Sequence, residues 1–197
     1  MVCTEKGGRL MRELLRNARL ICPLQNLDAK GWLLIEDGII SDNGTGSADS
    51  TIRADKITDC KGHIIGPGLV DMRVQSGYPG AEHLETMSSL LQAAASGGMS
   101  TIVLLPSTLP VIDNAAMIDS LQVRANRANG PKVHCYGAIT KKLKQEQMAE
   151  LGLMAKAGAV GFASGTMSIQ SALTMYRIMT YAAMLDKPVI HHCEDFS

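Results

Sequence analysis

The stretch "VDMRVQSGYPG", residues 70–80, places an arginine and a glutamine two residues apart at the end of a predicted strand. Its apolar start predicts a buried strand from Leu69 to Val74, which runs out into a polar Gly-Pro turn. Side chains alternate along a strand, so Arg73 and Gln75 are expected to point to the same side. Two imidazoles at this spacing could hold a metal ion. A guanidinium cannot ligate a metal, and a glutamine amide is a poor ligand.

A second stretch, "PVIHHCED" at residues 188–195, offers better donors in a similar position. Alternation predicts that His191 and His192 point to opposite faces of a strand. A histidine held by packing or a hydrogen bond is the alternative to a working ligand for His192. Arg73 could likewise place its charge over an anion, or could simply pair with an acid or with water.

Composition excludes several classes of protein. The 197 residues carry 19 Lys+Arg against 19 Asp+Glu, and 4% are aromatic, so the basic, aromatic face of a nucleic-acid-binding protein is absent. No apolar run reaches the roughly 18 residues that a membrane span requires. The five cysteines form no Cys-x-x-Cys pair and are odd in number. This pattern favours reduced thiols and a cytoplasmic location.

The pattern along the chain predicts three parts. Residues 1–10 resemble a flexible lead. Residues 11–65 contain short β-type runs broken by the turn-rich "SDNGTGSADS", which predicts a β-rich module. From residue 66 to residue 197, apolar strands alternate with amphipathic helices, and the strands begin roughly 30 residues apart, which is the length of a βαβ unit.

Each predicted helix carries an apolar stripe that we expect to face the core. The first two stripes are Met87, Leu90, Leu91, Ala94 and Ala95, then Ile118, Leu121, Ala125 and Ala128. The third is Met148, Leu151 and Ala155, and the fourth is Ile169, Ala172, Leu173, Tyr176, Met179 and Ala183. Asp113 is the expected N-cap of the second helix.

Alternating strands and helices predict an α/β fold with a parallel sheet. A (β/α)₈ barrel needs eight such units, and the sequence supplies five. The chain is therefore either an open five-stranded sheet or a barrel without its last three units.

Four collinear motifs decide between these alternatives. They are "GPGLVDMRVQSGYPGAEHLET", "AAASGGMSTIVLLPSTLPVIDN", "AGAVGFASG" and "PVIHHCED". Together they resemble the dihydroorotase branch of the amidohydrolase superfamily, over nearly all of this chain but only about the first half of a complete member. The resemblance implies the first five βα units of a metallo-dependent hydrolase (β/α)₈ (TIM) barrel. Residues 11–65 would form part of a composite β-sandwich.

The resemblance also implies where a zinc site would lie. In active relatives one or two zinc ions activate a water that opens the ring of dihydroorotate. Arg73 and Gln75 stand at the positions of two histidine ligands, and Gly165 stands where an aspartate ligand is expected. Gly77 and Ser107 replace an arginine and an asparagine that contact the substrate. His192 alone matches a ligand, so it is the relic of a metal site, and no cofactor is expected.

Two functions remain open on these residues. The chain is either a catalytically inactive dihydroorotase-like protein that acts as an assembly partner in pyrimidine biosynthesis, or an active cyclic amidohydrolase with an altered metal site. For the first, the resemblance implies the aspartate transcarbamoylase catalytic chain as the partner. Five strands leave open sheet edges, so we also expect self-association into a homo-oligomer.

Overall fold

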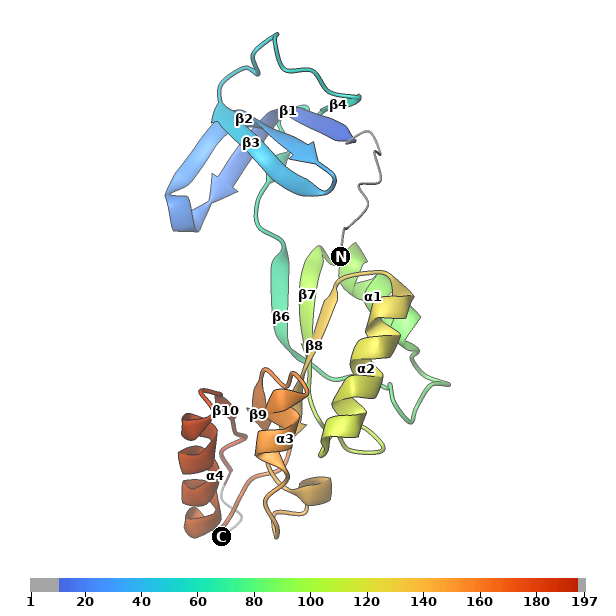
Figure 1. Ribbon diagram of the computed structural model, residues 1–197, viewed down its shortest axis with the longest axis vertical. Helices are drawn as coiled ribbons and strands as arrows, with labels where there is room; N and C mark the ends of the chain where they lie inside the picture. Colours follow the sequence, from blue (N-terminus) through green and yellow to red (C-terminus); the bar gives the residue numbers. More distant parts are fainter. Residues whose placement is uncertain (1–10, 195–197) are drawn as a thin grey trace, which may run out of the picture. The chain divides into compact units, whose positions relative to one another are not determined.

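The computed structural model describes residues 11–194, and the chain divides into two compact units after Pro67 (Figure 1). The predicted lead, residues 1–10, lies outside the described residues. The first unit is a mixed five-stranded sheet in which β2 pairs antiparallel with β1 and β3, whereas β4 and β5 pair parallel with β1. Its strands are β1 (Arg12–Cys22), β2 (Leu27–Glu36), β3 (Ile39–Thr45), β4 (Lys56–Asp59) and β5 (Ile64–Ile65), with a 3₁₀ turn at Pro23–Gln25.

Local sequence explains the hairpin between β2 and β3. Asp37 and Gly38 both have positive φ, at 48° and 81°, as a two-residue hairpin loop that matches the twist of the strands requires. Leu14, Trp32 and Leu34 form the small core of this unit. Ala48, Ile52 and Ala54, from the turn-rich segment that follows β3, pack against this core.

The second unit confirms the predicted alternation of strands and helices. Its five strands are β6 (Leu69–Val74), β7 (Met99–Leu104), β8 (Lys132–Ala138), β9 (Gly161–Ala163) and β10 (Val189–Ile190). They lie side by side in chain order and all pair in parallel. The helices between them are α1 (Met87–Ser96), α2 (Ala115–Ala128), α3 (Leu151–Lys156) and α4 (Ala172–Met184), and a 3₁₀ turn covers Lys141–Leu143.

Strands β7, β8 and β9 carry buried apolar residues on both faces, as expected for the wall of a barrel whose outer side is covered by helices. Ile102, Leu104 and Phe162 belong to the main core, together with buried residues of the helices such as Ile118 and Ile178. The alternate positions along β7, β8 and β9 form a second cluster of Val103, Leu105, Tyr136 and Ala163. The unit is therefore the N-terminal part of a (β/α)₈ barrel, with helices on its outer face.

Two details of the helices differ from the sequence prediction. The N-cap of α2 is Asn114, whose side chain accepts a hydrogen bond from the Met117 amide, and the carboxylate of Asp113 instead accepts from the Lys142 amide. Both residues can cap a helix, so composition alone could not choose between them.

The stripe predicted for the fourth helix is wrong in its orientation. Leu173, Tyr176 and Met179 are exposed, whereas Ile178 and Ala182 are fully buried. The predicted stripes of α3 and α4 also begin too early, because Met148 and Ile169 precede these helices. Helix α4 is apolar around most of its circumference, so periodicity could not select the buried face. No helix within residues 11–194 is long and apolar enough to cross a membrane.

Candidate functional site

The candidate site lies where the parallel strands end. In a barrel of this type the loops that follow the strands carry the chemistry, because all the carboxyl ends meet at one rim. Arg73 is the penultimate residue of strand β6 and Gln75 directly follows this strand. Ser107, Gly165 and His192 follow β7, β9 and β10. The fold thus brings the predicted site residues to one rim, which we define as Arg73, Gln75, Ser107, Gly165 and His192.

The hydroxyl of Ser107 lies where a side chain at position 165 would begin. Gly165 has a φ of +66°, and a Cβ atom at this position would overlap the hydroxyl oxygen of Ser107. The same Cβ would also lie 3.3 Å from a methyl carbon of Leu143. Ser107 Oγ is buried, and no residue of the described chain accepts or donates a hydrogen bond to it. A longer side chain at position 165 therefore has no room unless Ser107 changes or moves.

The side chains of Arg73 and Gln75, at the end of β6, share no hydrogen-bond partner within the described chain. Arg73 and Gln75 are both exposed, and the Arg73 amide donates to the carboxylate of Asp71 at 2.9 Å. Within residues 11–194 the guanidinium itself makes no hydrogen bond or ion pair. Gly77, the third predicted position on this loop, donates its amide to Glu85 Oε2 at 3.1 Å. An arginine here would need room beside Glu85 Cβ, which lies 3.2 Å from a Cβ at position 77.

His192 is held by its own loop and by the neighbouring strand. Its amide donates to Ser164 Oγ at 3.0 Å, which ties the ends of β9 and β10 together. Its Nε2 lies 3.2 Å from Glu194 Oε2. The one matching histidine is therefore paired with an acid two residues away.

His191 has a structural role that the sequence did not indicate. Its Nε2 accepts a hydrogen bond of 2.9 Å from the Ile169 amide, so the proton of the neutral ring lies on Nδ1, which is 3.4 Å from Cys193 Sγ. Burial, and then the charge of His192, lower the pKa of His191. Both keep the ring neutral, as this hydrogen bond requires. No sequence signal could reveal this contact, because it joins loops 22 residues apart.

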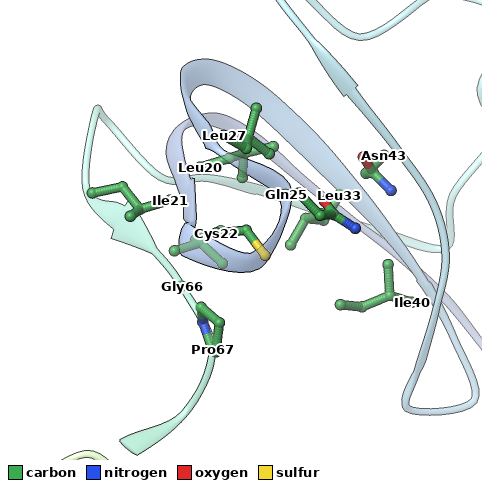
Figure 2. A pocket seen from close by; sticks show the side chains of 11 residues that line it. Leu20, Ile21, Cys22, Gln25, Leu27, Leu33, Ile40, Asn43, Gly66 and Pro67 are labelled. Carbon is green, nitrogen blue, oxygen red and sulfur yellow. The ribbon is translucent and has the colours of Figure 1, made fainter.

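One hollow of the described chain lies beside the rim residue His192, and another lies in the N-terminal unit. The first, of about 470 Å³, is lined by His191, Cys193 and Glu194 together with residues 168–170. The second, of about 370 Å³, lies on the N-terminal sheet and is lined mainly by apolar side chains such as Leu20, Leu27, Leu33 and Ile40 (Figure 2). Its polar side chains are amides and the Cys22 thiol, so it offers no acid–base pair. The ionisable side chains near a hollow are therefore those beside the rim.

Comparison with known proteins identifies the family. Residues 62–197, well over half of the chain, match the model of the dihydro-orotase-like family. The chain belongs to this family. A dihydroorotase of Wolbachia sp. subsp. Drosophila simulans is 39% identical over 181 residues, which cover 92% of this chain and 40% of that relative. A dihydroorotase of Anaplasma phagocytophilum is 37% identical, with 91% and 40% covered. The chain thus spans about 40% of the length of these relatives.

Solved structures show the same fold. The chain is similar to the L-hydantoinase of Arthrobacter aurescens, with a TM-score of 0.76 and 23% identity over 93% of this chain and 41% of that one. It is also similar to a dihydroorotase, with a TM-score of 0.61 and 14% identity over 93% of this chain and 51% of that one. These likenesses confirm the predicted fold, the N-terminal part of a (β/α)₈ barrel.

The residues at the rim do not fit the zinc that the family implies. A catalytic zinc site needs about three protein donors roughly 2 Å from the ion. Arg73 presents a cation, Gln75 an amide and Gly165 no side chain, and the orphaned Ser107 hydroxyl fills the space next to Gly165. Within residues 11–194 no group of three or more histidine, cysteine, aspartate or glutamate side chains could hold a metal ion.

Proposed function

We propose that this chain is a catalytically silent member of the dihydro-orotase-like family that acts as a structural partner in pyrimidine biosynthesis. The observation that carries the proposal is that three of the four rim positions where the resemblance implies metal ligands, Arg73, Gln75 and Gly165, hold no metal-binding side chain. At position 165, where the resemblance implies a carboxylate, there is no side chain, and Ser107 Oγ lies where its Cβ atom would be. A hydrolase of this type needs such ligands, because the zinc that they would hold supplies its nucleophile.

The charge of Arg73 supports the same conclusion. A guanidinium at a histidine-ligand position would place a permanent positive charge beside a dication, and the two would repel each other. Its exposure leaves the charge in water, where it costs little. The rim thus tolerates Arg73 as a surface residue, but not together with zinc.

The proposed partner is the catalytic chain of aspartate transcarbamoylase. The resemblance implies this partner for inactive members of the family. The intact outer face of the sheet supports it, because a chain that keeps its packed frame can still present a binding surface. Sedimentation velocity of the two purified proteins, alone and mixed, tests this part. A complex of defined stoichiometry is expected, and two independent boundaries would remove this partner.

A chimera tests whether the rim lacks catalytic activity. Residues 11–194 replace the matching segment of the Wolbachia relative, which supplies the rest of the barrel. We expect no hydrolysis of dihydroorotate above background, with cooperative melting showing that the chimera folds. Turnover that depends on zinc would overturn the proposal in favour of an enzyme with an altered site.

A matched control asks whether the rim is the cause. The same chimera carries Arg73→His, Gln75→His, Gly77→Arg, Ser107→Asn and Gly165→Asp, which restore the pattern that the resemblance implies. If this control binds zinc and turns over substrate and the parent chimera does not, the residues at these five positions explain the lack of activity.

A further inference from the structure

Helices α3 and α4 lie side by side on the outer face of the second unit, with a groove between them (Figure 1). We call it the α3–α4 groove. It holds a hollow of about 560 Å³, lined mainly by apolar side chains such as Leu151, Leu153 and Leu185. Along the same face α1 packs on α2 and α2 packs on α3, whereas α3 and α4 have no comparable contact. Helix α3 leads into β9 and α4 follows it, and β9 pairs with a strand on each side. The groove therefore does not border an open edge of the sheet.

Gly152 leaves room for the ring of Tyr181, which also lines the groove. A Cβ atom at position 152 would lie 2.6 Å from the Tyr181 hydroxyl oxygen, so a larger residue there would displace the ring. No residue of the described chain forms a hydrogen bond with this hydroxyl. It can therefore donate to an acceptor that enters the groove.

Basic side chains border the groove. Lys156, the last residue of α3, and Lys187, which follows α4, both line the hollow. Arg177 lies one turn before Tyr181 on α4, and residues four apart share a side of a helix. Within residues 11–194 none of these three cations forms an ion pair or a side-chain hydrogen bond. Their charge is thus available to an acidic group from outside.

Acidic side chains near the groove are few. Helices α3 and α4 contain none. Glu150 lines the hollow, but its Oε1 lies 4.0 Å from Lys141 Nζ. Asp186 is next to Lys187 in the sequence and does not line the hollow. The α3–α4 groove is therefore apolar along its walls and positive at its edge, which is complementary to an apolar segment flanked by acids.

The walls of the groove indicate the kind of occupant. Both walls are helices, so they offer no open row of backbone groups to which a strand could be added. A small-molecule site usually encloses most of its ligand, whereas Leu153 is 53% exposed and Lys156 extends into solvent. An amphipathic helix can lay its apolar side in such a groove and keep its charged side in water.

A second copy of the chain offers no suitable helix within residues 11–194. Helices α1, α3 and α4 have no acidic residue, and α2 has one, Asp119. The carboxylates that would answer Lys156 and Lys187 therefore have to come from a different protein.

We propose that the α3–α4 groove binds an acidic amphipathic helix of a partner protein. The apolar side of this helix packs on Leu153, Leu185 and the ring of Tyr181, and its carboxylates face Lys156 and Lys187. The proposal goes beyond the proposed function, since it assigns a binding surface and the chemistry of its occupant whether or not the rim is catalytically silent.

The probe for this groove is a synthetic peptide of about 15 residues, with leucines at helical spacing on one side and glutamates flanking them. Two matched peptides carry lysine in place of every glutamate, or serine in place of every leucine. Fluorescence anisotropy measures their binding to the purified chain. Only the leucine–glutamate peptide is expected to bind, and its affinity should fall as salt is added.

Reversing the charge of the groove gives a second test. The double variant Lys156→Glu, Lys187→Glu should bind the leucine–glutamate peptide at least about 10-fold more weakly and should prefer the lysine peptide. Lys30→Glu, Lys144→Glu is the matched control, because it makes the same change of charge at exposed lysines that do not line the groove. This control should bind as the parent does.

The three peptides test the proposal on the parent chain alone, and circular dichroism checks that both variants fold. The proposal is overturned if the leucine–glutamate peptide does not bind, if either matched peptide binds equally well, or if the charge-reversed variant keeps the preference of the parent. A dimer in sedimentation velocity that this variant loses would assign the groove to a second copy and would also overturn it. None of these measurements involves turnover, so failure here is distinct from failure of the proposed function.

Discussion

The outer face of the parallel sheet and the rim at its strand ends are built from the same strands, but they differ in how completely their side chains are used. On the outer face Leu104, Phe162 and Ile178 have no exposed surface and pack in one cluster. At the rim Arg73 and Gln75 extend into solvent, and the hydroxyl of Ser107 has no partner within the described chain. Different residues thus provide the core packing and the side chains of the rim. The packing can therefore be retained although the rim has lost the expected metal ligands.

The contrast predicts a large difference in mutational sensitivity. Phe162→Ala should lower the free energy of unfolding by about 3–5 kcal/mol, because it removes a buried ring and leaves a cavity. Arg73→Ala should change it by less than about 0.5 kcal/mol, since the side chain is exposed. Urea unfolding followed by circular dichroism measures both. Equal losses for the two variants would mean that the rim carries packing after all.

A second substitution probes the one crowded point of the rim. Gly165→Asp should lower the free energy of unfolding by about 1–3 kcal/mol, because the new side chain overlaps Ser107 and residue 165 has a positive φ. Ser107→Gly should recover, in the double variant, the part of this loss that comes from the overlap. The measurement is a double-mutant cycle in urea. Additive effects of the two changes would show that these residues do not compete for space.

Two cysteines allow the same comparison by chemical labelling, because Cys135 is buried and Cys193 is exposed. Burial raises the pKa of the Cys135 thiol on β8 to about 12. At pH 8 iodoacetamide should therefore label the exposed Cys193 of the native chain and leave Cys135 unmodified, whereas both react in urea. Peptide mass spectrometry distinguishes the two sites, and early labelling of Cys135 in the native chain would contradict its burial.

The raised pKa of Cys135 also predicts in which direction stability changes with pH. Its pKa in the fold lies above the value of about 9 in the unfolded chain. The unfolded thiol therefore loses its proton first. The contribution of Cys135 to stability is complete below pH 9 and decreases as the pH rises toward about 12. The variant Cys135→Ala should show a flatter decline in urea midpoint over this range.

Much of the fold could be predicted because it depends on local patterns. Apolar runs and Gly or Pro punctuation located the strands and helices of the second unit. The face of α4 could not be predicted, because Leu173 and Ile178 are equally apolar and only the tertiary fold distinguishes them. The positions of the rim followed from the strand ends, but the close approach of Ser107 to Gly165 joins two loops far apart in the sequence. Such contacts depend on backbone geometry that composition does not encode.

The most direct test of the central claim is a zinc titration of the purified chain by calorimetry, with metal content measured before and after. We predict no stoichiometric zinc bound through Arg73, Gln75, Gly165 and His192, and no change in the titration when His192 is replaced in His192→Ala. One equivalent of tightly bound zinc that is lost in His192→Ala would contradict the account.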